Sequence, residues 1–205
     1  MSHEAFMRRA IALAQEGMDR GHGGPFGSVV VWGGSIVGEG QNRVTSTNDP
    51  TAHAEVVAIR VACAALGRFD LAGCEIYASC EPCPMCLSAI YWARLDRVWY
   101  ANGRDDAARI GFDDALIYRE VALAPGARSL PMQRLLPDEA RAAFDAWLPR
   151  GDLDTRRRSR PWTLRAGRCL YLTGPGVPTS GEGSRRAAIQ RHRPVRGAKP
   201  RETPP

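Results

Sequence analysis

The chain of 205 residues has no long apolar run, no secretory leader pattern and almost no lysine. No segment approaches the roughly 18 consecutive apolar residues of a membrane-spanning helix, so we expect no membrane contact. The stretch MSHEAFMRRAIALAQEGM carries Glu4 and Glu16 and lacks the apolar core of a secretory signal. We therefore expect a cytoplasmic protein, in which clustered cysteines favour metal binding or catalysis over disulfides.

Lysine is absent from residues 1–147, where 14 Arg face 18 acidic residues and give a net charge of −4. Residues 148–205 hold 13 Arg and the single Lys against 4 acidic residues, a net charge of +10. The basic charge is therefore confined to the C-terminal segment, and the body gives no indication of a nucleic-acid partner. Nonspecific contact between nucleic acid and this basic segment stays open.

The apolar pattern predicts helices that alternate with strands. A helix is expected over residues 3–20, followed by the strands PFGSVVVW and SIVGEGQN, joined at Gly33-Gly34. Asp49-Pro50 predicts the start of a second helix, which Gly67 ends. The strand CEIYAS, the helix PMCLSAIYWARL and the strand RVWYA follow. This order is typical of a layered α/β domain, expected over residues 1–147.

Residues 148–205 differ in composition from the rest of the chain. They contain 8 Pro and 7 Gly, the run RRRSR and no sustained periodicity. This composition predicts a disordered or atypical tail.

Two short stretches contain candidate metal ligands. His53 stands in the first turn of the second expected helix, and Cys83 and Cys86 stand three residues apart in the first turn of the third. Three such ligands would leave a tetrahedral zinc ion one open position, as in catalytic sites. Cys80 as a fourth ligand would make the site structural instead, but it lies beyond Pro82 at the end of a strand. We interpret Cys80 as a packed thiol.

Glu55 stands two residues after His53, beside the expected metal rather than on it. A carboxylate there could take a proton from water and deliver it to a leaving group. His-x-Glu together with Pro-Cys-x-x-Cys is the known signature of zinc-dependent nucleobase deaminases.

Longer stretches of the sequence indicate one family among these deaminases. GGPFGSVVV, GEGQNRVTSTNDPTAHAEVVAIR, SCEPCPMCLSAIYWAR and AARIGFDDALIY resemble the small bacterial guanine deaminases, over roughly residues 1–147. The resemblance implies a cytidine deaminase-like fold, a three-layer helix-sheet-helix sandwich with a central five-stranded mixed sheet. It also implies one zinc per chain, a homodimer, a small purine base as substrate, and hydrolysis of guanine to xanthine and ammonia.

The resemblance also implies roles for single residues. Catalysis would fall to Glu55 and Asp114, and zinc binding to His53, Cys83 and Cys86. Without the resemblance, Asn42 would be interpreted as a turn residue that follows a strand. Asp114 would be interpreted as one of two solvent-exposed aspartates, together with Asp113. Phe26 and Trp92 would be interpreted as aromatic residues of the core or of a dimer interface. The substrate-binding residues implied by the resemblance are Asn42, Phe26, Ala54 and Trp92.

Three alternatives stay open. A tRNA adenosine deaminase shares the zinc motif but would need a basic surface, which the charge of the body does not provide. A related deaminase could act on guanosine, cytosine or an aminotriazine. A zinc-stabilised binding domain would have no use for the Glu55 carboxylate.

The resemblance ends after the phrase FDAW. Guanine deaminases of this kind end soon afterwards, with a tail exchanged between protomers and an aromatic residue near its end. Here no Tyr stands about nine residues after Trp147. Three explanations of this difference stay open. The segment after Trp147 could be a genuine extension, the chain could belong to a different branch of the family, or the coding sequence could contain a frame error.

Overall fold

The computed structural model describes residues 1–148 of the chain. Contacts divide the chain into the units Met1–Pro137 and Asp138–Pro205, and helix α7 (Pro137–Trp147) lies at the start of the second unit. The domain boundary expected after residue 147 stays a prediction. The predicted disorder of the basic tail falls on residues that lie outside the described part.

The first unit contains the four strands, and most of the helices, of the described residues. In chain order its elements are α1 (His3–Asp19), β1 (Gly27–Trp32), β2 (Ser35–Gln41), α2 (Val44–Thr47), α3 (Ala54–Leu66), β3 (Cys74–Cys80), α4 (Pro84–Trp92), β4 (Arg97–Asn102), α5 (Arg104–Arg109), α6 (Ala115–Val121) and the 3-10 helix η1 (Pro125–Ala127).

The sheet has the strand order β2-β1-β3-β4. Strand β1 pairs antiparallel with β2 and β3, whereas β3 and β4 run parallel and are joined through α4. The mixed sheet was expected, but the prediction of five strands is wrong for the described residues. After β4 the chain forms α5 and α6, and Pro125 and Pro131 follow, which lack the N–H that a strand ladder needs.

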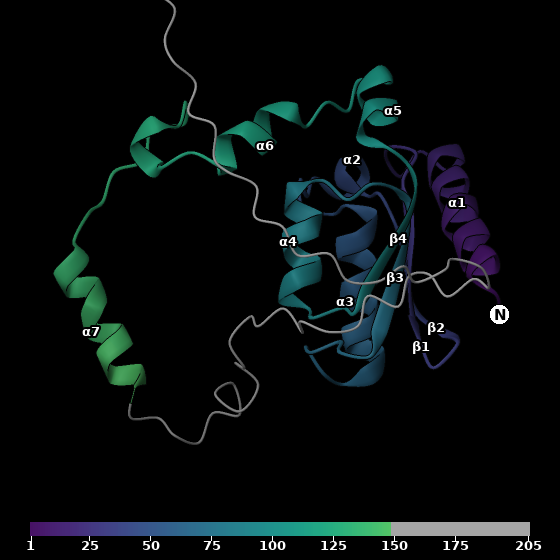
Figure 1. Ribbon diagram of the computed structural model, residues 1–205, viewed down its shortest axis with the longest axis horizontal. Coiled ribbons are helices and arrows are strands. Elements are labelled where there is room, and N and C mark those ends of the chain that lie inside the picture. The colour runs from purple at the N-terminus through teal and green to yellow at the C-terminus, as the bar shows by residue number, and fades with distance from the viewer. Residues whose placement is uncertain (149–205) are drawn as a thin grey trace, which may run out of the picture. The chain divides into compact units, whose positions relative to one another are not determined.

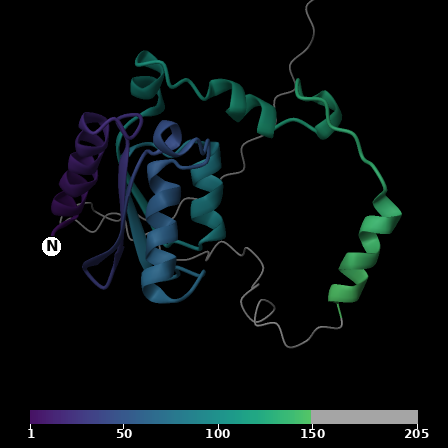
Figure 2. The ribbon, with the colours of Figure 1, turned by 180° about the vertical axis from the view of Figure 1, so that it is seen from behind.

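Helices cover both faces of the sheet. Helix α1 lies on one face, and α3 and α4 lie side by side on the other (Figures 1 and 2). Successive residues of β1 point to opposite faces, so Val29 and Val31 join the core under α1 while Val30 joins the core under α3 and α4. The described body therefore has the three-layer α/β architecture predicted from the sequence.

Helix α3 packs very closely on β2. A Cβ at Gly40 would collide with the carbonyl oxygen of Ala54 and lie 2.6 Å from the backbone nitrogen of Ala58. Glycine at this position lets the first turn of α3 rest directly on the strand. This contact fixes where the helix begins relative to the sheet.

Two sequence predictions about turns had different outcomes. The hairpin at Gly33-Gly34 is confirmed, with φ values of +56° and +79°. The start of the second helix at Asp49-Pro50 is wrong, because α3 begins at Ala54. Asp49 instead closes a local turn, in which its carboxylate accepts hydrogen bonds from the backbone N–H and hydroxyl of Thr51.

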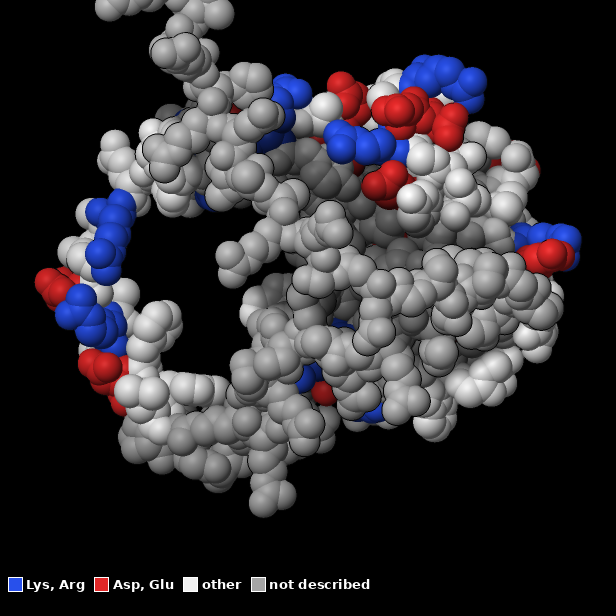
Figure 3. Space-filling view, viewed as in Figure 1, with Lys and Arg blue, Asp and Glu red and all other residues white. Residues whose placement is uncertain are grey.

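Charged side chains of both signs lie close together on part of the described surface (Figure 3). On the face shown in Figure 3, acidic and basic side chains are interspersed around α5 rather than gathered by sign. Arg109 and Asp106 of that helix form an ion pair. None of the described helices is long and apolar enough to cross a membrane.

Candidate active site

The N-termini of α3 and α4 carry the predicted metal ligands. His53 is the N-cap residue of α3 and Cys83 is the N-cap residue of α4, both with extended backbone. The His53 imidazole makes no capping bond to α3, while the Cys83 thiol lies within hydrogen-bond reach of Cys86 in the first turn of α4. Pro84 follows in the first turn, which tolerates a residue without an N–H, and Cys86 comes one turn later.

Their ligand atoms converge on one point. His53 Nδ1 lies 3.6 Å from Cys83 Sγ and 3.5 Å from Cys86 Sγ. All three ligand atoms lie within 4.8 Å of one another. Zinc bonds of about 2.0 Å to nitrogen and 2.3 Å to sulfur would span this triangle without rearrangement. The spacing and the donor set of one imidazole and two thiols fit a zinc ion with one open position.

The Cys83 and Cys86 thiols lie within hydrogen-bond reach of each other and shift each other's pKa. A hydrogen bond from Cys86 lowers the pKa of the Cys83 thiol to about 4, and His53 adds to the effect. The same bond raises the pKa of Cys86. The hydrogen bond to Cys83 also raises the pKa of His53, against the opposing effect of burial. A metal ion would replace the thiol proton and stabilise both thiolates.

Glu55 lies in the first turn of α3 with only 7% of its surface exposed. Burial raises the pKa of its carboxyl above the ordinary glutamate range, and the nearby Cys83 thiolate acts in the same direction. A carboxyl group with a raised pKa can both accept and release a proton near neutral pH. Its place next to the ligand cluster fits the proton-transfer role predicted from the sequence.

The remaining described cysteines lie outside the cluster. Among the described residues, the His/Cys/Asp/Glu group able to hold a metal consists of His53, Cys83 and Cys86. The buried Cys80 thiol instead donates to the carbonyl oxygen of Gly103 at 3.7 Å, and burial raises its pKa to about 11. The interpretation of Cys80 as a packed thiol is therefore confirmed.

Asn42 follows the end of β2 and is buried. Its side-chain oxygen accepts hydrogen bonds from the backbone N–H groups of Gly24 and Val44, at 3.3 and 3.2 Å. These bonds fix the orientation of the amide and leave its NH₂ group as the part able to donate to a ligand. Asn42 is thus both the turn residue that its position suggests and a candidate donor.

Phe26 stands just before β1 and contacts the loop that carries GFDD. Its ring meets that of Phe112 edge to face, with centroids 4.9 Å apart. Its carbonyl oxygen accepts the backbone N–H of Asn42 at 3.0 Å. The three residues therefore form one group that links two segments far apart in the sequence.

Asp114 is the N-cap residue of α6, and its side chain does not cap that helix. One carboxylate oxygen lies 3.9 Å from Nη2 of Arg104. Burial raises the pKa of the Asp114 carboxyl, Arg104 opposes this, and the Cys83 thiolate adds to it. One of the groups that shift the pKa of Asp114 is therefore the predicted zinc ligand Cys83.

Comparisons with known proteins identify the family. The family model of the cytidine and deoxycytidylate deaminase zinc-binding region matches residues 1–102. The chain is 54% identical over 147 residues to guanine deaminase of Bacillus subtilis, covering 72% of this chain and 94% of the relative. The solved structure of guanine deaminase from Bacillus subtilis superposes with a TM-score of 0.70 at 53% identity, over the same shares of both chains.

The chain belongs to the guanine deaminase family.

More distant relatives share the zinc region. A tRNA-specific adenosine deaminase of Agrobacterium fabrum is 42% identical over 95 residues, which is 46% of this chain and 62% of the relative. A solved structure in complex with 2,6-diaminopurine has a TM-score of 0.53 at 34% identity and covers 55% of this chain and 63% of that one. The guanine deaminase likeness extends over far more of the chain than the likeness to the tRNA enzyme.

Two predicted substrate residues of this guanine deaminase family member lie in different settings. Ala54 is buried at the first position of α3, where a helix N–H has no intrahelical acceptor. Trp92 ends α4 and is 75% exposed. It follows Cys83 by nine residues, which at 1.5 Å per residue is about 13 Å along the helix. The structure therefore does not bring Trp92 to the cluster of its own chain.

Three residues near the site were missed by the sequence reasoning. Phe112 lies against Phe26, and the ring of Tyr118 stacks under the guanidinium of Arg104 at 4.2 Å. Phe112 could have been noticed as the aromatic member of GFDD. No sequence pattern pointed to Arg104 and Tyr118, because an arginine and a tyrosine on short helices are ordinary surface residues.

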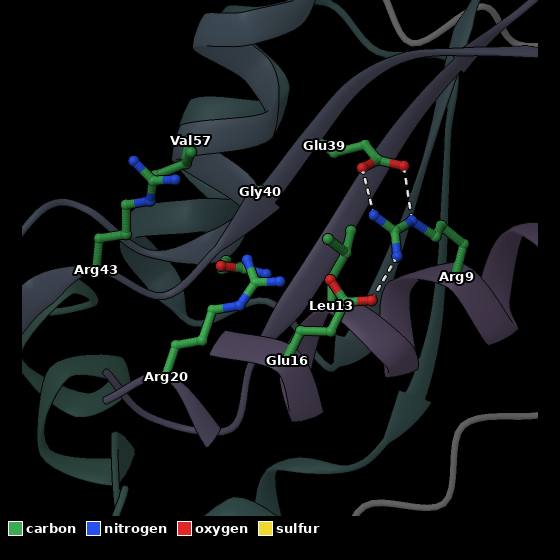
Figure 4. Close-up of a pocket in the computed structure, with 9 residues that line it drawn as sticks. Arg9, Leu13, Glu16, Arg20, Glu39, Gly40, Arg43 and Val57 are labelled. Carbon is green, nitrogen blue, oxygen red and sulfur yellow. Dashed lines mark hydrogen bonds and ion pairs between the residues drawn. The ribbon is translucent and has the colours of Figure 1, made fainter. Parts of the chain in front are cut away.

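A separate pocket of about 240 Å³ opens at the β2 edge between α1 and α3. Figure 4 shows the guanidinium of Arg9 held between Glu39 and Glu16. Both oxygens of Glu39 accept from Arg9, at 2.8 and 2.7 Å. None of the zinc ligands lines this pocket. The Arg9 ion pairs therefore join α1 to β2 at a place separate from the predicted zinc site.

Proposed function

We propose that this protein hydrolyses guanine to xanthine and ammonia with one zinc ion per chain. The observation that carries the proposal is the buried Glu55 carboxyl beside the converging His53, Cys83 and Cys86 ligand atoms. A purely structural zinc site needs no buried carboxyl at its side. Guanine is chosen over other bases because of the likeness to guanine deaminase over 72% of the chain.

His53, Cys83 and Cys86 would hold the zinc. When bound, zinc lowers the pKa of a coordinated water toward neutrality and so supplies the nucleophile for hydrolysis. Glu55 would take one proton from the water and deliver it to the ring nitrogen, and would then take the remaining proton of the added hydroxyl and deliver it to the departing amine. The C2–N bond of guanine breaks, a C2–O bond forms, and ammonia leaves.

The substrate side would hold the flat purine ring. The NH₂ group of Asn42 suits the O6 and N7 acceptors of guanine, since the side-chain oxygen is already engaged. Phe26 and Phe112 offer an aromatic wall for the ring. Asp114 would face the ring N–H and amine groups and assist Glu55. A relative solved with bound 2,6-diaminopurine supports a purine base as ligand.

A homodimer in the cytoplasm is part of the proposal. Large apolar side chains are exposed on and after β4, among them Tyr100, Ile110 and Leu116, together with Trp92 at the end of α4. A second copy of the chain would cover them, and the predicted substrate role of Trp92 could then be exerted across the interface. Reduced thiols, which zinc binding requires, fit a cytoplasmic location.

The test is ammonia release by zinc-loaded protein. Guanine, guanosine, adenine, cytosine and a tRNA anticodon stem-loop are each offered, and the product is identified by its ultraviolet spectrum. The proposal predicts ammonia and xanthine from guanine and at least 100-fold lower kcat/KM for the others. Turnover of the stem-loop in preference to guanine would contradict it. The molar mass measured by light scattering should be twice that of one chain.

A further inference from the structure

Three contacts link α5, α6 and the two residues that precede the predicted zinc ligand Cys83. The backbone N–H of Arg104 donates to a carboxylate oxygen of Glu81 at 3.3 Å. The Arg104 guanidinium lies 4.2 Å above the ring of Tyr118. The Tyr118 hydroxyl donates to the carbonyl oxygen of Pro82 at 3.3 Å. Since Glu81 and Pro82 are neighbours in the chain, the contacts form a closed circuit, which runs from Glu81 through Arg104 and Tyr118 back to Pro82, the residue before Cys83.

Asp114 is attached to this circuit through Arg104. The two neighbouring aspartates of GFDD behave differently. Asp113 accepts the backbone N–H of Ala115 at 2.8 Å and so closes a local turn. Asp114 does not cap α6; its carboxylate interacts with its own backbone N–H and, among the described residues, pairs with Arg104 at 3.9 Å. The orientation of this carboxylate therefore depends in part on a side chain of another helix.

The segment that carries Asp114 has little packing to hold it. Neither α5 nor α6 contains a buried residue. Gly111 between them has a φ of +93°, a conformation that disfavours other residues. Without a buried face, polar and aromatic contacts must fix how α6 sits beside the zinc ligands.

We propose that Arg104 is a positioning residue for the reaction: it holds Asp114 and Tyr118 together and so seats the GFDD segment beside Cys83. The inference rests on the proposed function, in which Asp114 acts on the purine. Arg104 is not one of the predicted zinc ligands, and it acts through Asp114.

Arginine suits this task better than lysine. A planar guanidinium can stack on the Tyr118 ring and still present an N–H toward Asp114. A lysine ammonium has no planar group to stack on the Tyr118 ring, so it could pair with Asp114 or lie over Tyr118 but not do both as well. Arg104→Lys therefore tests geometry separately from charge.

Arg109 provides a matched control on the same helix. It pairs with Asp106 at 3.8 Å on the surface, and its side chain is 78% exposed. Arg109→Gln removes the same charge from α5 without touching Asp114 or Tyr118. Tyr118→Phe is a milder second variant, since it keeps the ring under Arg104 but loses the bond to Pro82.

The experiment measures kcat, KM, zinc content and thermal unfolding of the full-length variants with guanine as substrate. Arg104→Gln is expected to lower kcat/KM by about 10- to 100-fold, since small misplacements near the reacting atoms have effects of this size. Arg104→Lys should recover only part of the loss, Tyr118→Phe should lose about two- to fivefold, and Arg109→Gln should match the unaltered protein. Zinc should stay at one per chain throughout.

A double-mutant cycle with Asp114→Asn separates positioning from a general structural role. If Arg104 acts through Asp114, adding Arg104→Gln to Asp114→Asn should cost less than about threefold. Equal losses in both backgrounds, or unchanged kcat/KM in Arg104→Gln, would overturn the assignment. Should Arg104→Gln fail to fold, the same cycle is run with Tyr118→Phe. No guanine turnover by the unaltered protein would instead overturn the proposed function, and the assignment with it.

Discussion

The zinc side and the substrate side of the site are built in different ways. The zinc side consists of the first turns of α3 and α4, where Glu55 and Cys86 are buried and the helices pack on the sheet. The substrate side includes residues 103–121, whose helices α5 and α6 bury nothing and depend on a few polar and aromatic contacts. A hydrophobic core fixes the first region, while single side chains fix the second.

This difference separates two properties of the enzyme. Because the ligand cluster is part of the core, changes there affect metal binding and folding together. Because the segment with Asp114 rests on few contacts, changes there affect turnover and leave the metal in place. Lightly packed segments also open most readily, as a substrate-binding element must.

The largest effect is expected from Cys86→Ser. The change removes a buried ligand atom 3.5 Å from His53 Nδ1. Zinc content should fall from one to below about 0.1 per chain, and guanine turnover should become undetectable. Cys80→Ala is the control, since its thiol donates to the carbonyl oxygen of Gly103 and is not part of the ligand cluster. Loss of zinc in Cys80→Ala would show that the cluster extends to Cys80.

Glu55→Gln should separate metal binding from chemistry within the zinc side. The amide has the shape of the carboxyl but cannot carry a proton between water and the amine. We expect zinc at one per chain and kcat lower by about 10³-fold, within the range for loss of a general acid–base group. Activity within tenfold of the unaltered protein would remove Glu55 from its assigned role.

Gly40→Ala should displace the first turn of α3, and with it the zinc side, by a substitution in the neighbouring strand β2. The new methyl group would collide with the first turn of α3, which carries Glu55. We expect a loss of about 2–3 kcal/mol in the free energy of unfolding, measured in urea, and weaker zinc binding. Gly126→Ala is the matched control, because a Cβ there meets nothing within 4 Å. Equal stability of the two variants would show that α3 adapts without strain.

The smallest effect is expected from Arg9→Gln, outside both regions. Arg9 lowers the pKa of the Glu39 carboxyl, so the pair stabilises the fold above the ordinary glutamate pKa. Both side chains are about one third exposed, which limits the loss to about 1 kcal/mol. The stability difference should be full at pH 7 and vanish as the pH falls through the lowered pKa of Glu39. A difference that persists at pH 2, or any loss of activity, would contradict this.

The two regions also differ in how well the sequence predicts them. His53, Glu55, Cys83 and Cys86 are found from spacing, because local helix geometry fixes which side chains share a turn. The alternation in β1 predicts its two-sided core for the same reason. The roles of Arg104 and Tyr118 depend on how two exposed helices meet residues 81–82, and no local pattern encodes this.

Two errors in the fold prediction have physical causes. The pair Asp49-Pro50 is typical of a helix start. In the structure, however, the Asp49 carboxylate accepts a hydrogen bond from the backbone N–H of Thr51, and α3 begins at Ala54. The start is set instead by the contact of Gly40 with α3, a tertiary effect. The expected fifth strand came from the family resemblance, while the described residues after β4 form helices and proline-containing turns.

The most direct test of the account is to measure zinc content and guanine turnover side by side in Asp114→Asn. Asp114 has the Cys83 thiolate within electrostatic reach but is not a ligand. The account predicts one zinc per chain and a kcat/KM at least 100-fold below that of the unaltered protein. Zinc lost together with activity, or activity retained, would contradict the division between a metal side fixed by the core and a substrate side fixed by single contacts.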